Sequence, residues 1–280
     1  MKKLLIAIMT LATMFIIGCG GGAALLSAPQ IVNVVMTETS ATITWEADST
    51  IENHLDFSGY NVYVAVDSTT LLVEDGENLD KFNATVIDTN TYEITPLNQD
   101  TVYYIQVRTV NTDDKVGGYN TTKPFIKVSP RPEFIKTVYM EWFNGDTTNC
   151  AIHFATGVLK MRDSISTTWG DMWVDHAVFA GPVDSVWFQS AYTADTTAGY
   201  RDTKLDNAGQ FDFDEVWEAT IPTLRTVPIA QGDLIFAKTV EGNYVKIHVD
   251  SLSFNSTYGW AKITYAYQNI PDFPYLSGRK

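Results

Sequence analysis

Short segments in which apolar and polar residues alternate with a period of two run through the chain from Ile31 onward. In residues 41–46, for example, Ala41, Ile43 and Trp45 fall on one face and three polar residues fall on the other. Turn residues separate these segments, and none of them sustains a helical period. Because side chains on a strand alternate between its two faces, the pattern predicts half-buried strands. The chain is therefore expected to be all-β.

The first residues have the order of a secretory signal. Lys2 and Lys3 precede an apolar run over residues 4–17, and two positive charges before a short apolar stretch are typical of such signals. A helix that spans a membrane needs about 20 predominantly apolar residues, and this run is shorter. We therefore expect a cleaved signal peptide over residues 1–18 and no transmembrane helix there.

The end of this run, Ile16-Ile17-Gly18-Cys19, resembles the lipobox of bacterial lipoproteins. The resemblance implies that Cys19 is acylated and becomes the new N-terminus, held by several acyl chains in a membrane. An ordinary signal peptide with a chance cysteine is the alternative. Residues 19–28, rich in glycine and alanine, are expected to form a flexible tether. Gly20 beside the cysteine favours the outer membrane, and the sequence leaves open whether the protein faces the periplasm or the cell surface.

The charge and the cysteine content exclude further classes of partner and site. The chain has 19 basic and 33 acidic residues, a net charge of -14. Loss of Lys2 and Lys3 with the signal leaves 17 basic against 33 acidic residues, or -16, which argues against nucleic acid as a partner. Once Cys19 is acylated only Cys150 remains. An intramolecular disulfide and a cysteine-based zinc site are thereby excluded.

Two motifs within residues 28–128 are typical of one kind of β-sandwich. Trp45 occupies the place of a core tryptophan on the second strand, and five residues separate Leu97 from Tyr103. These features resemble the fibronectin type III family and its Leu-x5-Tyr strand entry. The resemblance implies a tyrosine corner, in which the Tyr103 hydroxyl bonds to nearby backbone and Leu97 packs beneath it. Because the sequence lacks the integrin-type Arg-Gly-Asp tripeptide, we interpret this domain as a spacer.

The stretch Ser129-Pro130-Arg131-Pro132 is interpreted as a linker, because its two prolines disfavour both helix and strand pairing. Residues 133–280 are then expected to form a second, larger antiparallel β domain. The clearest unit is a hairpin over residues 234–250, whose turn Glu241-Gly242-Asn243 offers residues suited to positive φ. The expected strands cover residues 134–143, 151–155, 172–180, 183–191, 234–240, 244–252 and 259–267.

The C-terminal part of this domain, residues 232–268, resembles the C-terminal hairpin of the HmuY-like haem-binding lipoprotein family. Upstream, Phe154-Ala155-Thr156-Gly157 resembles the family's Thr-Gly turn, and residues 169–179 take the place of its Trp-Asp strand motif. The family's Asn-Gly-Gly loop is missing and its tryptophan is shifted, so that the fold carries over better than the ligand site. The hairpin resemblance is carried by Lys238-Thr239, Glu241-Gly242, Lys246 and Tyr265-Ala266-Tyr267-Gln268.

The resemblance implies haem as a ligand of the second domain, because haem iron accepts His or Met axially. His176 is the candidate first ligand, since it shares an otherwise apolar strand face with Met172. Met172, His153 and Met161 are the candidate second ligands. The alternative for His176 is a core histidine with a backbone partner. His248 has polar neighbours along its strand and is expected to be solvated.

Two classes of function follow from these observations. The first is capture of haem or a related tetrapyrrole, free or from a haem-carrying protein. The second is non-enzymatic adhesion or assembly, in which the second domain binds protein or glycan. A lipid-anchored hydrolase is a distant third, because no phosphate-cradling glycine loop, nucleophile elbow or paired His and nucleophile occurs in the sequence. We therefore expect a binding protein and not an enzyme, and an apolar pocket with a usable axial ligand would separate the first two classes.

Overall fold

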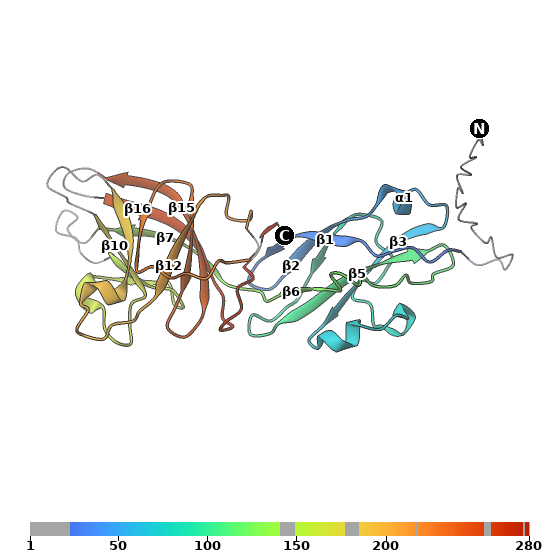
Figure 1. The fold of residues 1–280 in the computed structure, drawn as a ribbon, viewed down its shortest axis with the longest axis horizontal. Helices are drawn as coiled ribbons and strands as arrows, with labels where there is room; N and C mark the ends of the chain where they lie inside the picture. Colours follow the sequence, from blue (N-terminus) through green and yellow to red (C-terminus); the bar gives the residue numbers. More distant parts are fainter. Residues whose placement is uncertain are drawn as a thin grey trace, which may run out of the picture.

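The computed structural model describes residues 23–140, 149–176, 185–216, 218–254, 259–276 and 278–279. These residues form two antiparallel β-sandwiches, one after the other along the chain (Figure 1). This confirms the prediction of an all-β fold. None of the helices within these ranges has the length and apolar character needed to cross a membrane.

The first sandwich consists of a sheet in the order β17-β1-β2-β4 and a sheet in the order β3-β5-β6. Its strands are β1 (Gln30–Met36), β2 (Ala41–Glu46), β3 (Phe57–Ala65), β4 (Thr91–Ile94), β5 (Tyr103–Asn111) and β6 (Ile126–Val128), and β17 (Gly278–Arg279) joins them from the other end of the chain. One helix, α1 (Ser49–Glu52), and two 3-10 helices, η1 (Ser68–Leu71) and η2 (Gly76–Asn78), lie in the connections.

The core of the first sandwich confirms both motifs read from the sequence. Trp45 is completely buried, and its ring meets the ring of Tyr60 edge-on with centroids 5.3 Å apart. The Tyr103 hydroxyl accepts a hydrogen bond from the backbone N–H of Asn98 at 3.0 Å, and Leu97 is buried beside it. This is the expected tyrosine corner.

The second sandwich consists of two five-stranded sheets, β13-β11-β10-β8-β9 and β12-β14-β15-β16-β7. The strands of the first sheet are β8 (Ala151–His153), β9 (Val158–Lys160), β10 (Met172–His176), β11 (Val186–Ser190) and β13 (Thr226–Ile229). Those of the second are β7 (Glu133–Tyr139), β12 (Lys204–Gln210), β14 (Asp233–Lys238), β15 (Tyr244–Phe254) and β16 (Gly259–Tyr267), and the 3-10 helices are η3 (Arg162–Ser164) and η4 (Ala191–Ala194).

The inward faces of these two sheets pack into one apolar core. The expected hairpin is confirmed, because β14 pairs with β15 and the turn residue Gly242 has a φ of +90°. Strand β16 adds to β15 and extends the hairpin into a meander. Strands β9, β12 and β13 had not been expected from the sequence.

The segment between the sandwiches is held on both sides. The Arg131 side chain is completely buried. Its Nε donates to the carbonyl of Leu276 at 2.6 Å, and its backbone N–H donates to the carbonyl of Thr37 in the first sandwich at 3.0 Å. The last residues then continue to the first sandwich, where β17 pairs with β1. Residues 278–279, expected in the second domain, thus lie in a sheet of the first.

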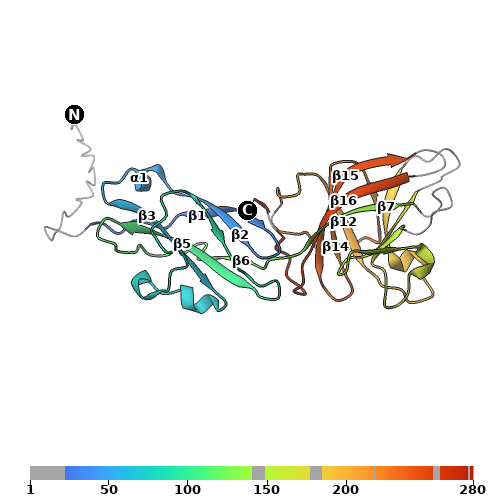
Figure 2. The same cartoon turned by 180° about the vertical axis from the view of Figure 1, so that it is seen from behind.

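The expected tether over residues 19–28 is corrected over the part that the structure describes. The backbone N–H of Ala23 donates to Asp113 at 2.7 Å, and that of Ala24 donates to Asp56 at 2.8 Å. Thr109 donates through Oγ1 to the carbonyl of Leu26 at 2.7 Å. These residues therefore dock on the first sandwich, at its end remote from the second (Figure 2).

Candidate functional site

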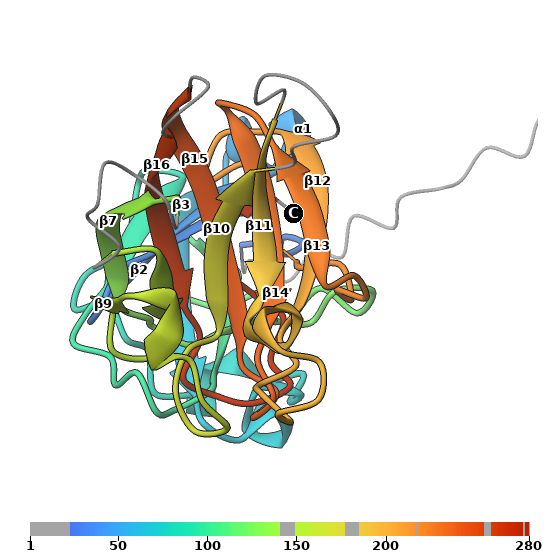
Figure 3. The same ribbon diagram turned by 90° about the vertical axis from the view of Figure 1, so that its left-hand side faces the viewer.

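The outward face of the sheet β13-β11-β10-β8-β9 carries the tryptophans Trp173 and Trp187. Figure 3 looks onto this sheet, with β10 and β11 side by side. Met172 and Val174 of β10 point into the core, so that Trp173 and Asp175, which alternate with them, point outward. On β11 the same alternation buries Val186 and Phe188 and turns the intervening residues outward.

One half of this face is centred on Trp187. The indole of Trp187 is partly exposed, and its Nε1–H donates to the hydroxyl of Ser185 at 2.7 Å. Asp175 is its cross-strand partner on β10, and Pro228 is its partner on β13. Gln189, two residues along the strand, donates through Nε2 to Asp175 at 2.8 Å. An aromatic ring, an amide and a carboxylate therefore stand together on one surface.

The other half of the face is covered by two loops, residues 161–170 and 191–201. Trp173 is buried beneath them, and its Nε1–H donates to the hydroxyl of Thr193 at 2.9 Å. The guanidinium of Arg162 lies 4.7 Å above the ring of Trp173 and donates to a carbonyl of the second loop at 3.0 Å. These contacts order both loops against the sheet.

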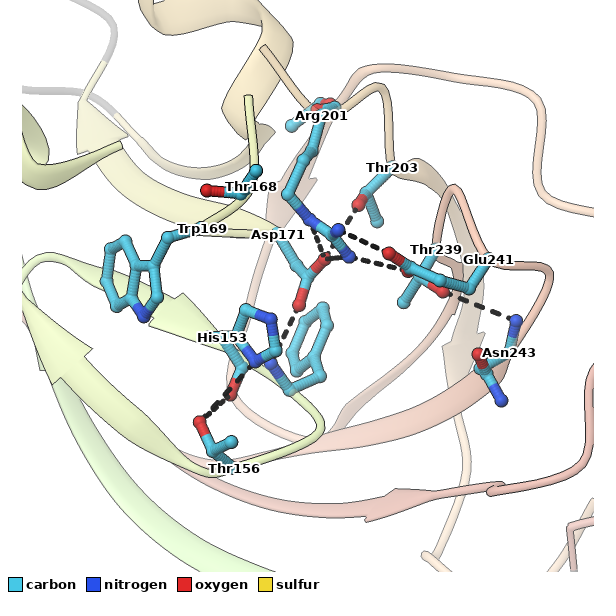
Figure 4. Close-up of polar contacts among 12 residues, drawn as sticks. His153, Thr156, Thr168, Trp169, Asp171, Arg201, Thr203, Thr239, Glu241 and Asn243 are labelled. Atoms are coloured by element: carbon cyan, nitrogen blue, oxygen red, sulfur yellow. Dashed lines mark hydrogen bonds and ion pairs between the residues drawn. The ribbon is translucent and has the colours of Figure 1, made fainter. Parts of the chain in front are cut away.

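Figure 4 shows the edge of this covered half, where the rings of Trp169 and His153 lie side by side. The two rings are stacked, with centroids 6.4 Å apart and an angle of 24° between their planes. The ammonium group of Lys160 lies 4.5 Å from the centroid of Trp169. The Nδ1 atom of His153 also lies 3.4 Å from the hydroxyl oxygen of Thr156. A cation and two flat rings thus gather at the end of β8 and β9.

An ion-pair network lies beside these rings (Figure 4). Arg201 binds Asp171 and also forms a two-pronged ion pair with Glu241, which lies in the turn between β14 and β15. The second oxygen of Asp171 accepts the backbone N–H of Phe154 at 2.8 Å. The hydrogen bonds from Arg201 lower the pKa of Glu241 to about 2. Because each group is engaged by its neighbours, we interpret the network as a structural fastening between the two sheets.

The three candidate haem ligands whose side chains the structure describes do not converge. Met172 and its cross-strand partner Ile152 are both completely buried in the core. His153 follows Ile152 and therefore lies on the opposite face of the sheet. Met161 is exposed beyond the end of β9. His176 ends β10, and its side chain lies outside the described residues.

Haem with two axial ligands therefore does not fit the described candidates, because Met172 and His153 are separated by the sheet itself. Among the described residues no group of three His, Cys, Asp or Glu side chains is arranged to hold a metal ion. Cys19, the candidate lipid attachment site, lies outside the described residues.

The opposite sheet holds a buried cation that was not expected from the sequence. Lys246 and His248 are two residues apart on β15, so both lie on the outward face of the sheet. Lys246 is nevertheless completely buried. Its Nζ donates to the carbonyl of Val216 at 3.3 Å and lies 4.8 Å from the ring centroid of Phe213, in a segment that covers the sheet. Burial, with the nearby charge of Arg131, lowers its pKa to about 7. His248 is only partly exposed and bonds to Asp250 at 2.8 Å.

Comparison with known proteins decides the nature of the first sandwich. The family model for the fibronectin type III domain matches residues 27–120. These residues are a fibronectin type III domain. Its sandwich extends to Val128, where β6 ends. Such a domain suggests a binding or adhesion role. A search of curated proteins finds no match to the chain.

Two solved structures are similar to the chain as a whole at low identity. Both are of a cycloalternan-degrading enzyme from Trueperella pyogenes, one of them in complex with cycloalternan. The identities are 12% and 11%, and the TM-score is 0.24 in each case. The alignments cover 87% and 91% of this chain and 31% and 34% of the enzyme. The chain thus spans about a third of the length of the enzyme that it matches.

Proposed function

We propose that the protein is a lipid-anchored, non-enzymatic binding protein of the bacterial outer membrane, and that its second domain binds glycan. The proposed site is the half of the outward sheet face made by Trp187, Asp175 and Gln189. The single observation that supports it most strongly is the partly exposed indole of Trp187 beside a hydrogen-bonded carboxylate and amide. The fibronectin type III domain would carry this site away from the membrane, as the spacer inferred from the sequence.

The chemistry of these side chains suits a sugar ring. One side of a pyranose ring presents C–H groups, which pack against the electron-rich face of an aromatic ring. Its hydroxyls act both as donors and as acceptors, and a carboxylate and a primary amide together offer both. The Trp187 indole is fixed by its bond to Ser185, so that little side-chain entropy would be lost when a ligand stacks on it.

Capture of haem, the other class of function considered, has weaker support. Met172 is enclosed in the core and His153 lies on the other face of the same sheet. Met172 could reach a haem iron only if the sandwich opened. The glycan proposal requires no rearrangement of the described residues.

The test is to screen the purified mature protein for glycan binding and to measure the affinity of the best ligand by calorimetry. Trp187→Ala should weaken binding at least about tenfold, equivalent to about 1.4 kcal/mol. Trp260→Ala is the matched control, because Trp260 is a partly exposed tryptophan on the outward face of the opposite sheet. Equal affinity of the two variants, or no glycan bound at all, would contradict the proposal. A six-coordinate haem spectrum that disappears in His176→Ala would favour haem capture instead.

A further inference from the structure

The end of the first sandwich where the described chain begins combines a docked N-terminal segment with two exposed leucines. Asn111 donates through Nδ2 to the carbonyls of Ala23 and Ala24, at 3.0 and 3.1 Å. The carboxylates of Asp56 and Asp113 accept the N–H groups of the same two residues. Four hydrogen bonds therefore fix the position at which the chain leaves the domain.

Gly117 shows that this docking is built into the fold. A Cβ atom at position 117 would lie 2.2 Å from the carbonyl oxygen of Leu26 and 2.4 Å from the hydroxyl of Thr109. These two atoms are joined by a hydrogen bond of 2.7 Å. A side chain at this position would thus push residue 26 away from the domain, and glycine permits the close approach.

The sequence leaves little chain between this docked segment and the proposed lipid. Gly20, Gly21 and Gly22 alone separate Cys19 from Ala23. Four residues reach at most about 14 Å when fully extended. A bilayer's polar region is itself roughly 6 Å deep on each side, which is half of the difference between its full thickness and its hydrocarbon core. If Cys19 is acylated, this end of the domain must therefore lie against the membrane surface.

The side chains at this end suit that position. Leu55 is 96% exposed and Leu25 is 66% exposed. Leu25 follows Ala24 in the sequence and Leu55 precedes Asp56. The hydrogen bond between Ala24 and Asp56 therefore brings the two leucines close together. The carboxylates of Asp56 and Asp113 would weaken contact with a bilayer, but both are already engaged by backbone N–H groups. An apolar tip is thus presented where the anchor would hold it.

We propose that Leu25 and Leu55 form a membrane-contacting tip that enters the headgroup region of the bilayer. The proposal rests on the lipid anchor at Cys19 that is part of the proposed function. The fibronectin type III domain then stands on the membrane by this end. The second sandwich, with the face around Trp187, is carried at the other end through the junction at Arg131.

The test uses the lipidated protein reconstituted into phosphatidylcholine vesicles that contain a quencher lipid. A single thiol is introduced as Leu55→Cys, or as Ile221→Cys on an exposed position of the second sandwich, and is labelled with a fluorophore. Labelling is selective because Cys19 carries the lipid and Cys150 is buried. Quenching at position 55 should exceed that at position 221 at least about twofold, since only the former lies within the roughly 5–10 Å that interfacial groups penetrate.

Two controls separate the possible results. Flotation with the vesicles reports the anchor independently, so that a protein that fails to float refutes the anchor and the tip together and leaves glycan binding by Trp187 unaffected. A flexible insertion of about ten residues after Gly22 adds roughly 17 Å of reach and should reduce the quenching at position 55. Equal quenching at positions 55 and 221 in floating vesicles, or no effect of the insertion, would overturn the proposal.

Discussion

Arg201 donates from Nη2 and from Nε to the same carboxylate oxygen of Asp171, at 2.6 and 3.0 Å, and the two side chains are only 7% and 1% exposed. Asp171 directly precedes β10 in one sheet, and Arg201 lies shortly before β12 in the other. Their ion pair thus joins the two layers of the second sandwich. Glu241, in the turn between β14 and β15, closes the network from the solvent side.

Replacement of Arg201 by methionine should destabilise the second sandwich by about 3–5 kcal/mol, because Asp171 would remain buried without its counter-charge. The matched control is Arg225→Met. Arg225 makes a similar two-pronged bond to Asp202 but is substantially exposed, and loss of such a surface pair should change stability by about 0–1 kcal/mol. Urea unfolding of both variants measures the difference. Similar losses in the two variants would show that the buried pair has no special role.

The loss of folding stability at low pH should depend on Glu241. Its pKa in the folded protein is about 2, below the ordinary value of 4.5, because Arg201 binds the charged form. The ionised carboxylate therefore stabilises the fold above pH 4.5, and this contribution is lost as the pH falls towards 2. Glu241→Gln should be less stable than the native protein at about pH 6 and should approach it at about pH 2. Unfolding is measured across this pH range, with Glu38→Gln at an exposed position as the control. A difference in stability between Glu241→Gln and the native protein that stayed constant with pH would contradict the prediction.

The first domain could be predicted in detail because its signals are local. Trp45 and the Leu97 to Tyr103 entry each lie within one short segment, and the structure places both as expected. The apolar alternation of Tyr60, Val62 and Val64 continues to Val66 in the sequence, but β3 ends at Ala65 and Val66 is exposed. The chain bends at this point. An alternation of apolar and polar residues does not by itself predict where a strand ends.

The candidate site was harder to predict because it depends on register between distant segments. That Met172 and His153 lie on opposite faces follows from the pairing of Met172 with Ile152, which no single segment reveals. The pairing of β17 with β1 joins the two ends of the chain and had no signal in the sequence pattern. Trp187 did have one, since it alternates with Val186 and Phe188, which are apolar and buried.

The tyrosine corner offers a test within the first domain. Tyr103→Phe removes the hydroxyl that accepts the N–H of Asn98, and we expect a loss of about 0.5–1.5 kcal/mol in the free energy of unfolding. Tyr104→Phe is the control, because Tyr104 is the next residue and lies on the other face of β5, against Phe125. Thermal unfolding of both variants compares them directly. A larger effect at position 104 would argue against the corner.

Lys246 should make the protein more stable as the pH rises. Its pKa in the folded protein is about 7 instead of 10.5, because burial disfavours its charge and Arg131 lies nearby. Between these two values the unfolded chain binds more protons than the folded one, so the free energy of unfolding increases with pH across this window. Below pH 7 the penalty of the buried charge is fully present.

Lys246→Met, which keeps the length of the side chain, should therefore be more stable than the native protein by roughly 1–4 kcal/mol at about pH 6. That advantage should shrink towards about pH 10. Urea unfolding at several pH values measures it, with the exposed Lys262→Met as control, and an advantage independent of pH would show that Lys246 does not titrate in this range.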